Sequence, residues 1–300
     1  MLAVNLNLLI AEDDISFRKF LLDYFRSRGI KNIYEASSGA EALQVCIENH
    51  INFIFSDWNM PEMSGGNFLE SVREILDYKD VPFIMLSVLS EKEKISKALK
   101  NKVDDYIVKP FRIKHLEKRF ESVLLDKCFS DYVALAFTYV GNQNYRLAKE
   151  KLTVAIQKNN QDEATLSGLI ICHAELGELE KAAKYVKLLK HKNAAALSLY
   201  AEGVLDSANN SLNAISKFRK CIEIDNSFVK ASIKLAQIQI VAREFEVALK
   251  LVESIDIQQL SYLCDVEAIL KIYRLLNDRS GGLKTKVLEY SKRVNYLKTR

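Results

Sequence analysis

The sequence predicts an α/β domain built on a parallel sheet, followed by an all-helical domain. Before about residue 125, short apolar runs alternate with amphipathic segments of helical period, which is the pattern of βα units. After residue 125 there is no proline, and the apolar pattern is helical almost throughout. We therefore expect one domain over residues 1–125 and a second over 126–300.

Each element of the first domain is predicted from its own pattern. Four short apolar runs indicate buried strands: Asn7–Ala11, Asn52–Ser56, Pro82–Ser87 and Asp105–Val108. Amphipathic segments indicate helices at Phe17–Arg28, Gly39–Asn49, Gly66–Leu76 and Ile113–Leu125.

Composition excludes several classes of protein. The 43 basic and 39 acidic residues give a net charge of +4, which offers no general reason to expect binding to nucleic acid or membranes. Five separated cysteines without a C-x-x-C pair indicate reduced thiols. The apolar start lacks a preceding Lys or Arg, so we expect a strand there and no signal peptide. No run of about 18 apolar residues occurs. The expected location is the cytoplasm.

The second domain shows an internal repeat. Ala148, Ala182, Ala214 and Ala248 recur in a similar setting at intervals of 34, 32 and 34 residues, with a larger apolar residue four positions after each. This period of paired helices resembles the tetratricopeptide repeat over about Cys128 to Tyr262. The resemblance implies about four repeats with capping helices, although the usual repeat-end proline is missing.

The repeat resemblance also implies a binding groove for a protein partner. The positions that usually line it are Val133, Phe137, Ile171, Leu199, Tyr200 and Ile233. Several of these residues could instead pack between helices. The basic chain end, from Lys284 to Arg300, is expected to be a solvated capping face, and a nucleic-acid site is the alternative.

Acidic residues follow two of the predicted strands. Glu12, Asp13 and Asp14 come after the first, and Asp57 comes after the second. The carboxyl ends of parallel strands share one edge, so these groups are expected to converge. Crowded carboxylates repel one another unless a cation lies among them, and Mg²⁺ prefers oxygen ligands. Ser87 and Lys109 end two further strands, and the whole set suits phosphoryl transfer.

These residues together resemble the receiver domain of response regulators, across Leu6 to about Leu125. The resemblance implies a flavodoxin-like, doubly wound five-stranded parallel sheet. It implies that Asp57 is the phosphoacceptor, that Asp14 binds Mg²⁺ directly and that Asp13 does so through water. The remaining implied roles are a metal-binding backbone carbonyl at Asn59, a phosphoryl-binding Lys109 before a cis Lys109–Pro110 bond, and the switch residues Ser87 and Tyr106.

Each of these residues has a plainer interpretation when taken alone. The Asp13–Asp14 pair could lie at a helix N-cap, Ser87 in a turn, Tyr106 in an ordinary strand and Lys109 in solvent. Val88 departs from the family pattern, which has a small residue there. We expect its bulk to slow access to Asp57.

The sequence therefore predicts a two-component response regulator. A histidine kinase or phosphotransfer protein would phosphorylate Asp57, and the helical repeats would carry the signal through protein–protein contacts. No separate enzyme is expected, since a receiver promotes only its own phosphorylation and dephosphorylation. The alternatives are a phosphate sink or modulator of a histidine kinase and a nucleic-acid-binding regulator. A homodimer through charges including Lys97, Asp104, Asp105 and Arg119 stays open.

Overall fold

The computed structural model describes residues 4–88, 103–159, 162–189, 196–209, 212–260 and 262–298. The chain divides into two compact units, Leu2–Leu135 and Ala136–Arg300. The division falls inside helix α6 (Phe129–Gly141), later than the expected residue 125.

The first unit contains a five-stranded parallel sheet in the order β2-β1-β3-β4-β5. This is the flavodoxin-like order that the resemblance implied. The strands are β1 (Asn7–Ala11), β2 (Asn32–Ala36), β3 (Phe53–Asp57), β4 (Phe83–Val88) and β5 (Asp105–Lys109). Because β3 is buried along its whole length, it lies at the centre of the domain and carries Asp57 at its carboxyl end.

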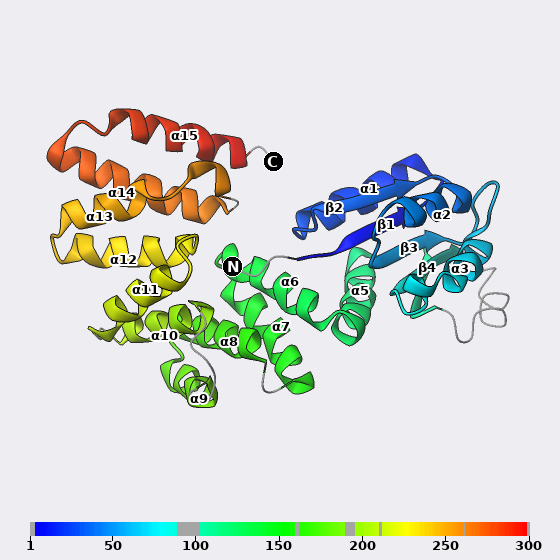
Figure 1. The fold of residues 1–300 in the computed structure, drawn as a ribbon, viewed down its shortest axis with the longest axis horizontal. Helices are drawn as coiled ribbons and strands as arrows, with labels where there is room; N and C mark the ends of the chain where they lie inside the picture. The colour runs from blue at the N-terminus through cyan, green and yellow to red at the C-terminus, as the bar shows by residue number, and fades with distance from the viewer. Residues whose placement is uncertain are drawn as a thin grey trace. The chain divides into compact units, whose positions relative to one another are not determined.

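Helices flank the sheet (Figure 1). They are α1 (Ile15–Ser27), α2 (Gly39–Glu48), α3 (Gly65–Glu74) and α5 (Ile113–Lys127), with a 3₁₀ turn η1 (Leu76–Tyr78). The first three begin at side-chain caps, because Asp14, Ser38 and Ser64 each accept a hydrogen bond from the backbone N–H three residues later. These caps fix where each helix leaves its loop.

Two apolar cores cover the sheet. On one face an aromatic cluster joins Phe25 of α1, Phe53 and Phe55 of β3 and Phe120 of α5, with ring centroids 5.0–6.0 Å apart. On the other face, residues of α2 and α3 pack against Leu9, Ile54 and Met85. Both faces of the sheet are thus buried, as a parallel sheet requires.

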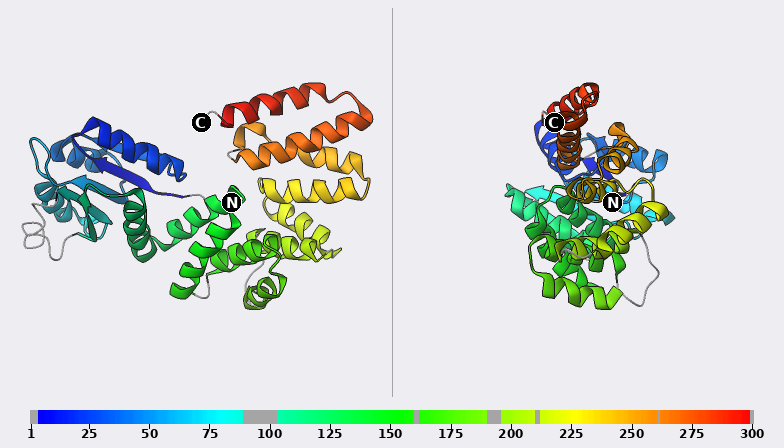
Figure 2. Two further views of the ribbon diagram at one scale, coloured as in Figure 1. Left: turned by 180° about the vertical axis from the view of Figure 1, so that it is seen from behind. Right: turned by 90° about the vertical axis from the view of Figure 1, so that its left-hand side faces the viewer.

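The second unit is all-helical over its described residues. Its helices after α6 are α7 (Tyr145–Lys158), α8 (Glu163–Glu175), α9 (Leu179–Leu189), α10 (Ala196–Ala208), α11 (Asn213–Ile224), α12 (Val229–Val241), α13 (Phe245–Glu253), η3 (Ile257–Gln259), α14 (Leu263–Ser280) and α15 (Lys284–Lys298). Consecutive helices pack as pairs, α8 with α9, α10 with α11, α12 with α13 and α14 with α15. Figure 2 shows the yellow to red helices stacked side by side.

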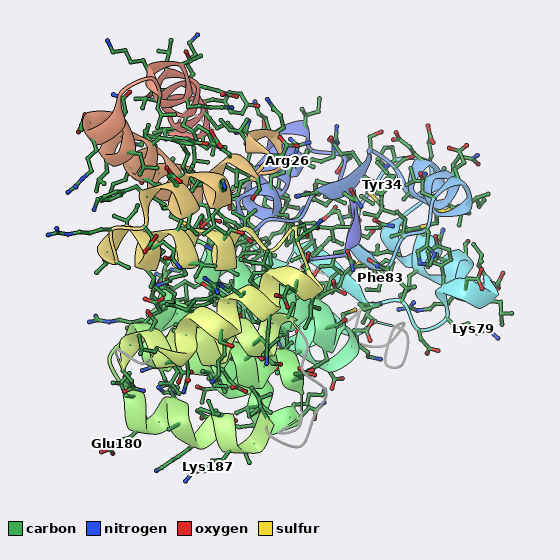
Figure 3. All side chains as sticks on the ribbon, turned by 60° about the vertical axis from the view of Figure 1, so that its left-hand side comes forward. Arg26, Tyr34, Lys79, Phe83, Glu180 and Lys187 are labelled. Atoms are coloured by element: carbon green, nitrogen blue, oxygen red, sulfur yellow. The ribbon has the colours of Figure 1, made fainter. Side chains whose placement is uncertain are left out.

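The recurring alanines lie where the helices of this unit meet. Ala148, Ala182, Ala214 and Ala248 are each at most 1% exposed. Glycine plays a similar part at Gly203, where an added Cβ would lie 2.7 Å from the ring of Phe218 on the paired helix. The opposite faces are polar, and Figure 3 shows Glu180 and Lys187 projecting from α9. The predicted helical periodicity is therefore confirmed.

The last helix pair, α14 and α15, packs with α12 and α13 around one apolar core. Tyr273 of α14 and Tyr290 of α15 are buried, with ring centroids 5.2 Å apart. The predicted capping segment is thus a two-helix hairpin. Among the described residues, no helix has the length and apolar character needed to cross a bilayer.

Candidate functional site

Four strand ends bring the predicted polar residues to one edge of the sheet. Glu12 follows β1, Asp57 ends β3, and Ser87 and Lys109 lie at the ends of β4 and β5. The strands are parallel neighbours, with Asp57 opposite Leu86 and Ser87 opposite Val108. The predicted convergence of Asp57, Ser87 and Lys109 at this edge is therefore confirmed.

Lys109 joins two carboxylates. Its Nζ lies 2.7 Å from Asp57 Oδ1 and 2.7 Å from Glu12 Oε2. Burial lowers the pKa of Lys109, but the hydrogen bonds to Asp57 and Glu12 outweigh it, so the pKa of this ammonium is raised. Lys109 therefore carries its positive charge at neutral pH beside two carboxylates, and the interpretation of it as a solvated surface charge is wrong. The Lys109–Pro110 bond is cis, as expected.

Glu12, Asp13 and Asp57 form the acidic cluster. One oxygen from each lies within 4.8 Å of the others. Burial raises the pKa of Glu12 to about 7, and burial also raises the pKa of Asp57, with Asp13 adding to the shift. Both shifts have the sign expected when carboxylates crowd together without enough positive charge. Three hard oxygen donors in this space fit a divalent cation such as Mg²⁺.

Asp14 does not belong to this cluster, which corrects the predicted metal ligand by one residue. Its Oδ1 accepts a hydrogen bond from Phe17 N at 2.9 Å and caps helix α1. Because α1 starts at Ile15, Asp14 occupies the cap position, while Glu12 and Asp13 lie directly after the strand. The acidic pair of the site is Glu12–Asp13.

The loop after Asp57 holds the carboxylate from the other side. Asn59 N donates to Asp57 Oδ2 at 3.1 Å, and Gly65 N donates to Trp58 O at 2.9 Å. A Cβ at Gly65 would lie 2.0 Å from Asp57 O, so the start of α3 approaches the strand end closely only because residue 65 is glycine. The role of the Asn59 carbonyl as a metal ligand stays a prediction.

Ser87 offers a buried hydroxyl. It is 1% exposed, and its Oγ has no hydrogen-bond partner among the residues that the structure describes. A buried polar atom without a partner is unusual and costs free energy, so it calls for a functional explanation. Tyr106 is half-buried against the core on the α2 and α3 side of the sheet. Its role as a switch residue stays a prediction.

Sequence reasoning missed three residues of this site: Glu12 as a partner of Lys109, Gly65 beneath Asp57, and Phe17, whose ring centroid lies 4.4 Å from Lys109 Nζ. Glu12 could have been found from the end of the strand, since the first carboxylate after β1 lies nearest the sheet edge. No motif or spacing in the sequence marked Phe17 or Gly65 as part of the site.

The predicted partner groove is wrong for five of its six residues. Val133, Phe137, Ile171, Tyr200 and Ile233 are each at most 5% exposed, and Leu199 is half-buried. They pack between helices, which was the alternative interpretation of the same pattern.

Polar contacts connect distant helices of the second unit. Lys234 of α12 pairs with Glu175 of α8 at 2.7 Å, and Lys230 pairs with Asp265 of α14 at 2.7 Å. The Cys264 thiol donates to Gly141 O.

The charges considered for a homodimer have partners within the chain. Asp104 pairs with Lys127 at 3.1 Å and Arg73 at 3.5 Å, and Arg119 pairs with Asp105 at 3.2 Å. Lys97 lies outside the described residues. At the basic chain end, a groove of about 410 Å³ between α14 and α15 is lined by Lys271, Arg274 and Lys298, and Glu267 neutralises Lys298 at 3.0 Å.

Comparison with known proteins decides the family. Residues 8–121 match the model of the response regulator receiver domain. A chemotaxis protein CheY homolog of Campylobacter jejuni is 34% identical over 120 residues, which cover 40% of this chain and 92% of that protein. The chain belongs to the response regulator receiver family.

Other relatives of this response regulator match a similar share of the chain. Chemotaxis protein CheY1 of Helicobacter pylori is 33% identical over 120 residues, covering 40% of this chain and 97% of the relative. Among solved structures, the receiver domain of Francisella response regulator 1452 is 34% identical, with 40% of this chain and 96% of that chain covered and a TM-score of 0.36. The helical unit, Ala136–Arg300, lies outside residues 8–121, which the family model matches.

Proposed function

We propose that this response regulator accepts a phosphoryl group on Asp57 from a histidine kinase or phosphotransfer protein. The observation that carries the proposal is the position of Lys109 Nζ, 2.7 Å from Asp57 Oδ1. A cation at this distance can neutralise charge on a phosphoryl group that arrives at the carboxylate. The unpartnered Ser87 hydroxyl supports the same function, because a phosphoryl oxygen would supply the acceptor that it lacks.

The reaction needs no further co-reactant. An Asp57 carboxylate oxygen attacks phosphorus, a P–O bond forms, and the P–N bond of a phosphohistidine donor breaks with its electron pair left on the donor imidazole. Lys109 holds a phosphoryl oxygen and the Ser87 hydroxyl donates to another. Water later attacks phosphorus, which releases phosphate and restores Asp57. The chain thus acts only on its own side chain.

Mg²⁺ would be held by Glu12, Asp13 and Asp57, with the Asn59 carbonyl as a further ligand. When bound, the ion would neutralise negative charge on the phosphoryl oxygens and relieve the repulsion among the three carboxylates. The raised pKa values of Glu12 and Asp57 support this assignment, because a cation among these groups would favour their charged forms.

Intact-mass measurement of the full chain tests the function. Acetyl phosphate with Mg²⁺ should add one phosphoryl group to the wild type. It should add none to Asp57→Asn, and none to the wild type once a chelator has removed the metal. An unmodified wild type, or an equally modified Asp57→Asn, would contradict the proposal.

The output of the chain is proposed to be a change in protein contacts of the helical unit, which we interpret as tetratricopeptide-like repeats. The spacing of the alanines, at 34, 32 and 34 residues, and the packing of consecutive helices as pairs support that interpretation. Helix α6 begins directly after α5 and contributes residues to both compact units. A shift of α5 on phosphorylation can therefore reach the helical unit through α6.

Hydrogen exchange tests the output. Acetyl phosphate should change exchange in α6 and in the helices after it in the wild type, and should leave Asp57→Asn unchanged. If acetyl phosphate changed hydrogen exchange only in residues before α6, the proposed coupling between the two units would be contradicted. A pull-down that compares wild type with Asp57→Ala under the same conditions would then identify the phosphorylation-dependent partner.

A further inference from the structure

Lys109 has an aromatic neighbour in addition to its two carboxylate partners. Its Nζ lies 4.4 Å from the centroid of the Phe17 ring, on the ring face. An ammonium at this distance is attracted by the negative face of the ring. Glu12, Asp57 and Phe17 thus surround the ammonium, and the Lys109 side chain is left 20% exposed.

Two elements hold the Phe17 ring in place. Asp14 caps α1 through a hydrogen bond from Phe17 N at 2.9 Å, which fixes the backbone of Phe17 in the first helical turn. Phe111, two residues after Lys109, packs edge-on against the ring with centroids 5.6 Å apart. The ring is therefore anchored both from α1 and from the loop that leads to α5.

We propose that Phe17 is a positioning residue for Lys109, an inference that rests on the proposed function of Asp57. A lysine ends in a hydrated point charge on a flexible four-carbon stem, so a partly exposed lysine can point into water as well as toward a carboxylate. The Phe17 ring occupies one side of that space and favours the ammonium position that faces Asp57. Without the ring, Lys109 spends less time where it can hold an incoming phosphoryl oxygen.

Substitutions of Phe17 test the proposal through the rate of phosphorylation of the full chain by acetyl phosphate. Phe17→Leu keeps apolar bulk and removes the ring, so the rate should fall about fivefold. Phe17→Tyr keeps an aromatic face and should stay within about twofold of the wild type. Phe20→Leu is the matched control, because Phe20 lies on the same helix and stacks on Phe17 with centroids 5.8 Å apart. It should also stay within about twofold.

A double-mutant cycle shows whether Phe17 acts through Lys109. In a Lys109→Met background, Phe17→Leu should change the rate less than about twofold, because the partner of the ring is already absent. The affinity for Mg²⁺, followed by the fluorescence of Trp58, should be the same in Phe17→Leu and the wild type. An undiminished effect of Phe17→Leu in the Lys109→Met background, or no effect in the wild-type background, would overturn the proposal.

Two outcomes separate this inference from the function on which it rests. If Asp57 is not the phosphoacceptor, the wild type and Asp57→Asn behave alike; if only the inference fails, the wild type is phosphorylated and Phe17→Leu matches it. Should Phe17→Leu fail to fold, the wild-type protein still gives an answer by NMR. The Lys109 ε-methylene protons should be shifted upfield by the ring, and an unshifted resonance would overturn the proposal.

Discussion

Lys109 Nζ lies at 2.7 Å from both Asp57 Oδ1 and Glu12 Oε2, so one ammonium joins the end of the central strand to the end of β1. The three side chains come from positions up to 97 residues apart in the sequence. The parallel sheet brings them together, because every one of its strands ends at the same edge.

Substitutions at Asp13 and Asp14 separate metal binding from helix capping. Asp13→Asn removes one of the carboxylates proposed to hold Mg²⁺ and should weaken Mg²⁺ binding about tenfold. Asp14→Ala should leave the Mg²⁺ affinity within about twofold and should lower the free energy of unfolding by about 1 kcal/mol, the usual cost of losing a cap. Trp58, the only tryptophan, reports the first quantity, and urea unfolding reports the second.

Asp14→Asn is the control for this pair, because asparagine caps a helix as well as aspartate does. It should match the wild type in both measurements. If Asp14→Ala lost Mg²⁺ affinity as strongly as Asp13→Asn, the acidic pair would have to be reassigned to Asp13 and Asp14.

Gly65→Ala should disturb the loop that carries Asp57. The new Cβ would lie 2.0 Å from Asp57 O, which is a backbone atom that cannot move aside without shifting β3 or α3. We expect a loss of about 1–3 kcal/mol in the free energy of unfolding and slower phosphorylation. At Gly66 a Cβ would meet only the Trp58 side chain, at 3.0 Å, so Gly66→Ala should cost less. Equal unfolding midpoints for the two variants would count against this account.

Val88→Ala should speed phosphorylation. Val88 is 42% exposed and lies opposite Lys109 in the β4–β5 ladder, at the edge of the sheet where Asp57 ends β3. A smaller side chain should admit a phosphodonor more readily, and we expect a rise of about two- to fivefold in the rate with acetyl phosphate. Val88→Ile is the opposite change and should not raise the rate. An unchanged rate in Val88→Ala would mean that residue 88 does not limit access.

Glu178 makes the helical unit sensitive to acid. Lys149 of α7, His173 of α8 and Lys181 of α9 converge on this carboxylate at 2.7, 2.7 and 3.2 Å. The Lys149 hydrogen bond contributes most to lowering its pKa from 4.5 to about 2, followed by His173 and Lys181. Burial lowers the pKa of His173, and the hydrogen bond to Glu178 opposes this shift. The carboxylate accordingly stabilises the fold at neutral pH.

The sign of this effect follows from the lowered pKa. The contribution is complete above the unfolded pKa of 4.5 and is lost as the pH falls from there through about 2. Glu178→Gln should therefore be less stable than the wild type at pH 7, with a smaller difference at pH 3.5. Urea unfolding followed by circular dichroism measures both differences. A difference that widened toward pH 3.5 would contradict the assignment.

The sequence was most informative for the buried strands, because a short apolar run in an alternating pattern of strands and helices fits only a central strand of a parallel sheet. The strands β1, β3 and β4 are apolar runs; the structure places β1 as predicted, and β3 and β4 each begin and end one residue later than predicted. β2 was not predicted from its own pattern, because Asn32–Ala36 is an edge strand with exposed and half-buried residues. Its existence followed only from the family resemblance.

The errors at the site arose where neighbouring residues offered the same chemistry. Glu12, Asp13 and Asp14 are three consecutive carboxylates, and only the end of β1 at Ala11 and the start of α1 at Ile15 decide which two face Asp57. The prediction that six residues line a partner groove was wrong for a related reason. Whether a repeat position lies open or buried depends on how closely successive helices pack, which a period in the sequence does not determine.

Asp57, held by Lys109, is the residue proposed to take the phosphoryl group. Borohydride reduction converts a phosphorylated aspartate to homoserine, so peptide mapping of the reduced protein identifies the acceptor directly. After treatment with acetyl phosphate and Mg²⁺, we predict homoserine at position 57 and at no other aspartate. Homoserine at Asp13 or Asp14, or its absence from a protein that carries the added phosphoryl mass, would contradict the account.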